Sequence, residues 1–218
     1  MTDRYPDYMQ AAVAQFHDAF DMPNLAKPSN LPTDRIELRV GLIREEGVDE
    51  LAHAASNGDV VGTIDALIDT IVVCHGALVE MGQQVIDTHQ PSPTDQAHDP
   101  KALLNSGLEV AKAIDGILPE LENIWSHQQA LHAVFFVSSI IKMALGVLIE
   151  SGTQPEPFFD EVHRANMSKL GADGRPIHSR GMELDGAPAG KTLKGPDYSP
   201  PDLAGVYARL YGKDALDG

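Results

Sequence analysis

The sequence predicts an all-α fold, an antiparallel helical bundle with a four-helix core and a long C-terminal loop. Two observations support this prediction. Long segments repeat apolar residues at the spacing of one helix face, whereas the strict alternation of a half-buried strand is hard to find. A tight turn at Asn57-Gly58-Asp59 joins two such segments, which favours antiparallel neighbours. A length of 218 residues fits a single domain, 1–218.

The first half of the chain contains three predicted helices. Residues 8–20 carry apolar side chains on one face. A second helix spans about 33–56, with Thr33 as a candidate N-cap. The third spans about 60–81 and ends before Gly82, the residue type that most often follows a helix in the left-handed conformation.

The second half continues with helices and loops. A polar loop at 89–100 precedes two predicted helices, at about 101–125 and 127–151. The first of these should be kinked or broken at Pro119, because a proline ring clashes with the preceding turn. The remaining elements are a helix from Pro155 or Pro157 to about Leu170, a long loop at 171–201 rich in Gly, Pro, Asp and Lys, and a short helix at about 202–211.

An internal repeat links the third and fifth predicted helices. At a constant offset of 70 residues, from Gly76 to Gly146, IDTIVVCHGALVEMG aligns with SSIIKMALGVLIESG. A diverged helix-pair duplication would explain the repeat and make the chain a pseudo-dimer. The alternative is that two buried helices ending in glycine have converged in composition. The copies differ at two acidic positions: Asp65 and Asp69 become Phe135 and Ser139.

Charge and composition exclude several classes of partner. The chain has 32 Asp and Glu against 16 Lys and Arg, a formal charge of −16, which repels nucleic acid and anionic membranes. Its one cysteine excludes a disulfide framework and four-cysteine zinc sites. No signal-peptide pattern opens the sequence, and the longest apolar stretch, 130–149, is interrupted by His132 and Lys142. We therefore expect a cytoplasmic protein.

Acidic residues concentrate on the second and third predicted helices, which should face each other. Residues three or four apart share a helix face, so Glu46, Asp49 and Glu50 project together, as do Asp65 and Asp69. The two aspartates lie in an apolar segment, where an isolated charge is costly. A hard divalent cation is the simplest partner, and oxygen ligands indicate Mg²⁺ or Mn²⁺. The alternative is a solvated acidic face with two aspartates at its edge.

Polar and cationic residues form a second group near the C-terminus. They are His163, Asn166, Lys169, Lys191 and Lys194. Cations that face a carboxylate-bound metal suit a di- or triphosphate substrate. Each has an ordinary alternative, because Lys169 is a common cation at a helix end and the loop lysines can be solvated. His17, on the first helix, is either a substrate contact or a hydrogen-bonded structural histidine.

Five motifs resemble those of the all-α nucleoside triphosphate pyrophosphohydrolases, the superfamily of MazG-like proteins, all-α dUTP/dCTP diphosphatases and phosphoribosyl-ATP pyrophosphohydrolase. The motifs are FHDAF with the following MP (16–23), RVGLIREEGVDEL (39–51), IDALIDTIVVCHGALVEMG (64–82), FFDEVHRANMSK (158–169) and GKTLKGPDYSPPDL (190–203). The last two are most similar to the phage and bacterial MazG-like branch. Residues 83–155 lack the resemblance and look inserted.

The resemblance implies a metal site of the ExxE…ExxD type. The metal ligands that it implies are Glu46, Asp49, Glu50, Asp65 and Asp69, and the candidate bases are Glu45 and Glu46. Ala66 departs from the pattern, because the family has an acid at that position, and Asp65 is its candidate substitute. The implied substrate-binding residues are His17, His163, Asn166, Lys169, Lys191 and Lys194.

The expected activity is Mg²⁺-dependent, or Mn²⁺-dependent, conversion of a (d)NTP to a (d)NMP and pyrophosphate. The alternatives are a non-catalytic nucleotide-binding or interaction protein with a degenerate metal site, and hydrolysis of phosphoribosyl-ATP, whose dedicated enzymes are typically shorter and lack this tail. The single domain then has an acidic half (about 6–82), a degenerate repeat (about 100–152) and a nucleotide-clamp tail (about 155–203). A homodimer stays compatible with this organisation.

Overall fold

The computed structural model describes residues 7–86, 97–185 and 193–212, and the regular structure within these ranges is helical apart from one isolated bridge at His178. This confirms the predicted all-α fold. The elements are α1 (Tyr8–Ala19), α2 (Thr33–Arg44), the π-helical segment η2 (Glu45–Glu50), α3 (Leu51–Ser56), α4 (Val60–Glu80), α5 (Pro100–Ser126), α6 (Ala130–Glu150), α7 (Pro155–Met167), α8 (Met182–Asp185) and α9 (Leu203–Tyr211).

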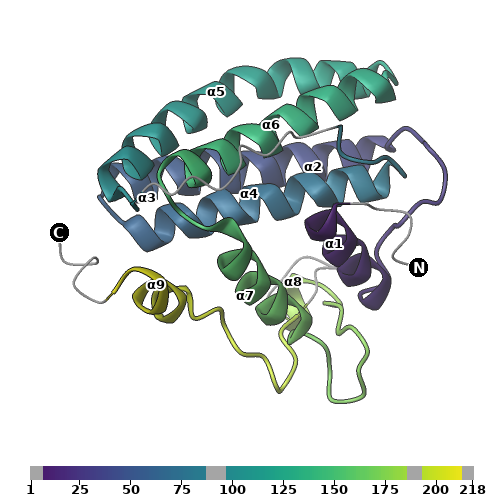
Figure 1. Ribbon diagram of the computed structural model, residues 1–218. Helices are drawn as coiled ribbons and strands as arrows, with labels where there is room; N and C mark the ends of the chain where they lie inside the picture. The colour runs from purple at the N-terminus through teal and green to yellow at the C-terminus, as the bar shows by residue number, and fades with distance from the viewer. Residues whose placement is uncertain (1–6, 87–96, 186–192, 213–218) are drawn as a thin grey trace.

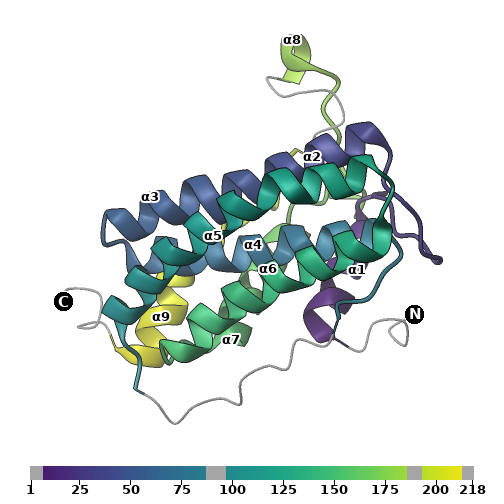
Figure 2. The same ribbon diagram turned by 90° about the horizontal axis from the view of Figure 1, so that it is seen from above.

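Two helical hairpins pack into one bundle. The continuous segment α2–η2–α3 pairs with α4, and α5 pairs with α6 (Figure 1). The hairpins join through contacts of α4 with α6 and of α5 with α2 and α3, and the view from above shows these rods side by side (Figure 2). Fully buried aliphatic side chains from both hairpins, among them Ile43, Leu67, Leu118 and Leu148, fill the space between them. Helices α1, α7 and α9 pack on the α4 side, below the bundle in Figure 1.

Both ends of α4 follow from its sequence. Asp59 caps the N-terminus, because its side chain accepts a hydrogen bond from the Gly62 backbone N–H at 2.8 Å. At the other end Gly82 adopts φ 62°, and Gln83 N–H donates to the Leu78 carbonyl at 2.9 Å, which is a Schellman motif. The predicted termination at Gly82 is therefore confirmed.

Two predictions about helix boundaries are wrong. Pro32, not Thr33, occupies the N-cap position of α2, and no side chain caps this helix. Helix α5 runs unbroken through Pro119, so the predicted break is wrong, whereas the predicted kink stays a prediction. An internal proline costs about 3 kcal/mol, but the flanking Leu118 and Leu121 are fully buried. Each such side chain contributes about 1.5–3 kcal/mol on burial, enough to offset the lost hydrogen bond.

The backbone repeats with the same offset of 70 residues as the sequence. Helices α4 and α6 both have 21 residues and begin and end at equivalent positions. The turn before each helix has one residue with positive φ at the equivalent place, Gly58 at 73° and Gln128 at 59°. Gly152 also repeats the φ of Gly82, at 73°. Equal lengths, turns and termini favour a duplication over convergence of composition.

By length and composition, α4 and α6 would each be able to cross a membrane. In both helices, however, 61% of the apolar window is buried inside the molecule. Their apolar character is therefore used for packing in the bundle, as predicted for residues 130–149.

A buried ion cluster ties α2 to the C-terminal end of α4. Arg39, only 2% exposed, donates to Glu80 at 2.7 Å, and Arg35 donates to the same carboxylate. Although burial alone would raise it, hydrogen bonds from the two arginines lower the pKa of Glu80. The Arg39 guanidinium lies over Gly76, where a Cβ atom would come within 2.6 Å of Nη1. Only glycine leaves room for this contact.

Replacing Gly76 with alanine should therefore destabilise the protein. Alanine favours a helix interior by about 0.5–1 kcal/mol, but its methyl group would displace a paired, buried guanidinium, and breaking such a pair costs about 3–5 kcal/mol. We expect a net loss of about 2 kcal/mol in the free energy of unfolding, measured by urea denaturation.

Gly41→Ala is the matched control, because no described atom lies within 4 Å of its Cβ position. This variant should be stabilised by about 0.5–1 kcal/mol. Equal effects of the two substitutions would contradict the proposed crowding at Gly76.

Candidate metal and nucleotide site

One π-helical turn, η2, interrupts the long helix of the first hairpin. Its glycine, Gly47, lies at the contact with α4 and α5, where a Cβ atom would be 3.1 Å from Ile114 Cδ1 and 3.3 Å from Thr70 Cγ2. The missing side chain lets the η2 backbone approach α4 closely. Single π turns are frequent at functional sites. The sequence predicted an uninterrupted helix here, so this feature was missed.

Glu46 of η2 has the most perturbed carboxylate of the site. Its Oε2 atom is buried and has no hydrogen-bond partner among the described residues. Burial, followed in order by the charges of Asp69, Glu50, Glu45 and Asp65, raises the pKa of Glu46 to about 8. A carboxylate in this position requires a proton or a cation.

Asp65 and Asp69 complete the cluster from α4. Burial, followed by the charge of Glu50, raises the pKa of Asp65 to about 6. For Asp69, burial and the charge of Asp65 raise the pKa to about 7, although Lys169 lowers it. The structure thus brings Glu46, Glu50, Asp65 and Asp69 into one electrostatic field, as the sequence predicted. Asp49 is exposed and is not among the charges that act on them.

The carboxylate oxygens of the cluster are suitable ligands for a hard divalent cation, but they are not arranged around a single metal position. Within the described ranges, no group of three or more His, Cys, Asp or Glu side chains converges on a single metal position. The donors are all carboxylates, however, and the buried Glu46 Oε2 lacks a partner. Oxygen-only donors are those that Mg²⁺ prefers. Side-chain movement would be needed for Glu46, Glu50, Asp65 and Asp69 to bind one ion together.

The structure accounts for Ala66. Its side chain is 3% exposed and belongs to the apolar core, whereas Asp65 interacts electrostatically with Glu50 of η2. An acid at position 66 would be directed into the core. Asp65 therefore lies on the face of α4 where the site needs a carboxylate.

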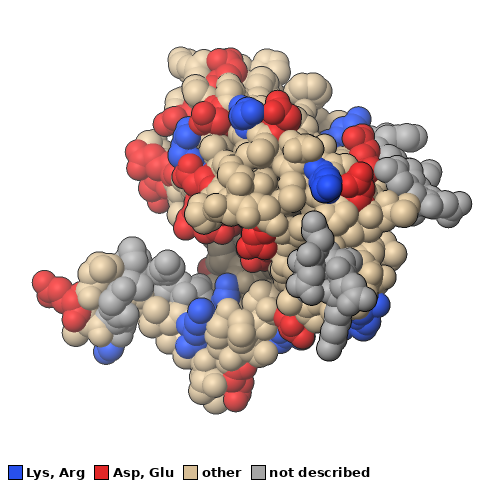
Figure 3. Space-filling view, turned by 90° about the vertical axis from the view of Figure 1, so that its left-hand side faces the viewer, with Lys and Arg blue, Asp and Glu red and all other residues tan. Residues whose placement is uncertain are grey.

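Cations approach the cluster from α7. Lys169 follows the end of α7, and its charge acts on Asp69, while its Nζ donates to Asn166 Oδ1 at 2.6 Å. Figure 3 shows a hollow with acidic side chains gathered above it and Lys and Arg side chains below it. The structure thus places positive charge opposite the carboxylates, the arrangement that a triphosphate requires.

The other predicted substrate contacts differ in how the structure places them. Lys194 is exposed, with its Nζ 4.4 Å from the Tyr198 ring centroid. His163 stacks on Phe159, and no described contact joins it to the carboxylates. Lys191 lies outside the described residues.

His17 is a buried, hydrogen-bonded residue in this fold. It is 2% exposed, its Nδ1–H donates to the Pro23 carbonyl at 2.7 Å, and its Nε2 lies 3.4 Å from Arg39 Nη2. Burial, followed by the charge of Arg39, lowers the pKa of His17 to about 4, so the ring is neutral near pH 7. The ion cluster around Glu80 lies eleven residues beyond Asp69, about 16 Å along the helix axis. These contacts favour the structural alternative for His17, and its role as a substrate contact stays a prediction.

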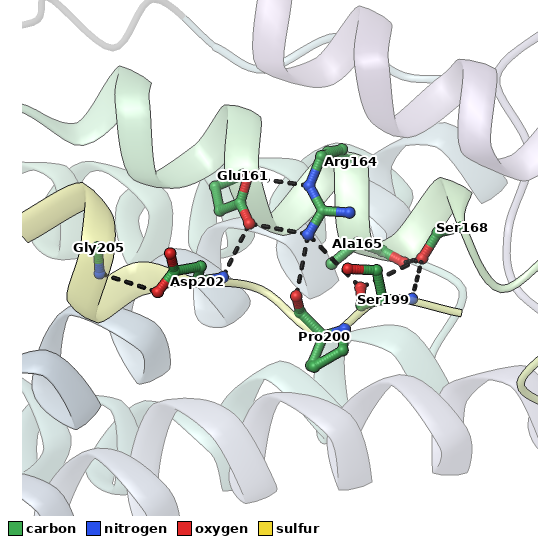
Figure 4. Close-up of polar contacts among 8 residues, drawn as sticks. All are labelled: Glu161, Arg164, Ala165, Ser168, Ser199, Pro200, Asp202 and Gly205. Carbon is green, nitrogen blue, oxygen red and sulfur yellow. Dashed lines mark hydrogen bonds and ion pairs between the residues drawn. The ribbon is translucent and has the colours of Figure 1, made fainter. Parts of the chain in front are cut away.

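An ion pair on α7 fastens the C-terminal segment, a role that sequence reasoning missed. Arg164 donates to both carboxylate oxygens of Glu161, at 2.9 and 2.8 Å, and to the Pro200 carbonyl at 2.9 Å (Figure 4). Glu161 also accepts from the Asp202 backbone N–H at 2.8 Å. Ser168 accepts from the Ser199 backbone N–H at 3.0 Å. The i, i+3 spacing of Glu161 and Arg164 predicts the pair, but not the loop it holds.

This fastening brings the segment before it close to Lys169. The Gly195 backbone N–H donates to the Lys169 carbonyl at 3.0 Å, and any side chain at Gly195 would clash with the Leu170 carbonyl. Lys194 is therefore held beside the end of α7 by backbone contacts. Two lysines far apart on the sequence thus lie near each other.

The described residues thus form a helical bundle with carboxylates on η2 and α4 and the cation of Lys169 near Asp69, as expected from the resemblance to the all-α nucleoside triphosphate pyrophosphohydrolase superfamily. Residues 13–90 match the family model of phosphoribosyl-ATP pyrophosphohydrolase, a family within that superfamily. The matched segment includes η2 and all of α4, and therefore every carboxylate of the cluster. The matched family consists of hydrolases that act on phosphoric anhydrides, and it supports a nucleotide pyrophosphohydrolase activity. Comparisons with curated proteins and with solved structures give no match.

The raised pKa values predict how stability depends on pH. Glu46, Asp65 and Asp69 have pKa values of about 8, 6 and 7, above the value of about 4 expected in the unfolded chain. Between these values the folded state binds more protons than the unfolded state, so the metal-free protein should lose stability as the pH rises from about 4 to about 8. Replacing Asp69 with asparagine should weaken this loss, measured as melting temperature against pH.

Magnesium should act in the opposite sense, because it competes with protons for the same oxygens. The rise in melting temperature on adding Mg²⁺ should be larger at about pH 8 than at about pH 5.5. It should disappear in the Asp69→Asn variant. A Mg²⁺ effect of equal size in that variant would show that the ion binds elsewhere.

The fastening by Arg164 can be tested by limited proteolysis. Arg164→Ala removes the donor to Glu161 and Pro200, so the segment around Lys194 should open more often, and tryptic cleavage after Lys194 should be about tenfold faster. Arg175→Ala serves as the control, because the Arg175 side chain takes no part in this network. An unchanged cleavage rate in Arg164→Ala would show that the ion pair does not hold the segment.

Proposed function

We propose that this protein is a Mg²⁺-dependent nucleoside triphosphate pyrophosphohydrolase, which converts a (d)NTP to a (d)NMP and pyrophosphate. The observation that carries the proposal is the buried Glu46 Oε2, which has no hydrogen-bond partner among the described residues and lies in the field of four further carboxylates. A charge of this kind is tolerated in folded proteins when a metal balances it. The family matched by residues 13–90 supports the same general activity.

The carboxylates would hold the ion between η2 and α4. Glu46, Glu50, Asp65 and Asp69 supply its oxygen donors, with Mn²⁺ as an alternative ion. When bound, the metal neutralises charge on the phosphate oxygens and polarises the reacting phosphoryl group. Asp49 is a further proposed ligand, although, unlike Glu50, it is not among the charges that act on the cluster.

A carboxylate of η2 would act as the general base. Glu46 has a pKa of about 8 in the metal-free protein, and a nearby cation would lower that value toward neutrality. Its Oε2 would then accept a proton from the attacking water, and a new P–O bond forms as the bond of the α–β bridge breaks and pyrophosphate leaves. Glu45, exposed beside it, is the other candidate base.

Lys169 and Lys194 would bind the outer phosphates. Lys169 already acts on Asp69, and Asn166 holds its Nζ. Positive charge at this place stabilises the leaving pyrophosphate as its negative charge develops. Lys191 and His163 are further proposed substrate contacts. We also propose that the reaction takes place in the cytoplasm, where nucleoside triphosphates are available.

The name of the matched family favours phosphoribosyl-ATP as a second candidate substrate. Phosphoribosyl-ATP contains the same triphosphate, so the same carboxylates and cations would serve. A non-catalytic nucleotide-binding protein is the remaining alternative, favoured by the absence of a converged metal site within the described ranges.

A pyrophosphate-release assay tests the activity and the substrate together. The purified protein with Mg²⁺ or Mn²⁺ should release pyrophosphate from at least one member of a panel of (d)NTPs and phosphoribosyl-ATP. Glu50→Gln and Asp69→Asn should each lower kcat by about a hundredfold or more, because they remove charge that balances the metal.

Glu120→Gln is the matched control, since Glu120 occupies the position equivalent to Glu50 in the second repeat and is exposed. It should retain full activity. If no substrate is cleaved while a non-hydrolysable dNTP still binds in calorimetry, the protein is a nucleotide-binding protein and the enzymatic proposal is wrong.

A further inference from the structure

The outer face of α6 exposes two large apolar side chains. Leu131 is 76% exposed and Phe135 is 60% exposed. They are four residues apart and therefore share one face of the helix. Isolated exposed apolar residues are ordinary, but a contiguous apolar face on a rigid helix indicates an interaction surface.

A groove continues this face toward the C-terminal end of α6. Its volume is about 570 Å³, and it lies between α5 and α6. The apolar part of its lining comes from Val110, Met143, Gly146 and Val147. The polar part comes from Asn105, Ser106, Glu109, Ser139, Lys142 and Glu150. No described atom lies within 4 Å of the Cβ position of Gly146. The groove therefore has room for a large apolar side chain.

The first repeat fills the equivalent space with its own side chain. Over Gly76, the counterpart of Gly146, lies the guanidinium of Arg39, paired with Glu80. The second repeat keeps Gly146 and Glu150 but has Glu109 where the first has Arg39. The space over Gly146 is consequently left open.

The residues of this face are arranged symmetrically along α6. Three pairs are centred on the same point, midway between Ile140 and Ile141: Leu131 with Glu150, Phe135 with Gly146, and Ser139 with Lys142. Two copies of α6 packed antiparallel about a two-fold axis at that point would bring the members of each pair together, as an isologous interface requires. The largest exposed ring then meets the position without a side chain.

We propose that the α5–α6 face is a homodimer interface, in which Phe135 of each copy enters the groove over Gly146 of the other. Ser139 and Lys142 would meet across the two-fold axis, where the hydroxyl accepts a hydrogen bond from the ammonium group. This interface is independent of the proposed enzymatic function, because it uses neither η2 nor α4.

The size of the face suits such a dimer. A 21-residue helix is about 32 Å long, and with the adjacent α5 the face is about 20 Å wide, roughly 600 Å² in projection. The accessible surface of a rough face exceeds its projection. It therefore approaches the ~800 Å² per partner of a standard interface.

Light scattering coupled to size-exclusion chromatography tests the proposal with the full chain. The wild type should have about twice the chain mass of 23.5 kDa. Phe135→Ala removes the inserted ring and Gly146→Phe fills the groove from within the same chain, so each variant should weaken dimerisation at least tenfold. The double variant carries both substitutions. In it, the new ring at position 146 of one copy faces the alanine at position 135 of the other, so the dimer should be restored.

Leu184→Ala is the control, because Leu184 is 66% exposed but lies on α8. Circular dichroism of Phe135→Ala, a surface change, verifies that loss of the dimer is not loss of the fold. A monomeric wild type, a dimer unaffected by Phe135→Ala, or a double variant that stays monomeric would each overturn the proposal.

Discussion

The site depends on one electrostatic constraint, the burial of like-charged carboxylates where η2 meets α4. Glu46 Oε2 has no hydrogen-bond partner in the described structure, and Asp69 and Glu50 act on the same group. Carboxylates so placed repel one another, and Glu46, Asp65 and Asp69 also lose hydration, whereas Glu50 is exposed. The apolar contacts of α4 with α6 supply stability that offsets this repulsion.

The two repeats differ in the side chains that they carry at equivalent positions. In the first repeat, polar groups form the carboxylate cluster, and Arg39 fills the space over Gly76. The equivalent positions of the second repeat carry Phe135 and Ser139 in place of Asp65 and Asp69, and the space over Gly146 is open. One scaffold thus presents a charged site on one side and an apolar surface on the other. A repeat without the carboxylate cluster can carry apolar side chains at positions where the other repeat carries charged ones.

Much of the fold could be predicted because helix ends and faces are encoded locally. The spacing of Asp65 and Asp69, and the glycine after α4, act within a few residues, and both predictions are confirmed. The π turn could not be predicted, because Gly47 is required only by its close contact with Ile114 on a distant helix. The role of Arg164 could not be predicted either, because its partner Pro200 is 36 residues away in the sequence. Tertiary contacts also override the local preference of Pro119.

The formal charge of −16 acts differently at long and short range. At physiological ionic strength, exposed charges are screened beyond about 8 Å, so most of the acidic surface neither attracts nor strongly repels a nucleotide. Within that distance the local charges decide, and here Lys169 lies opposite Asp69. A triphosphate would therefore meet positive charge first at the end of α7, and it would approach the carboxylates only together with a cation. The Glu161–Arg164 ion pair keeps that positive charge in place, so it matters to the site although it is remote from the carboxylates.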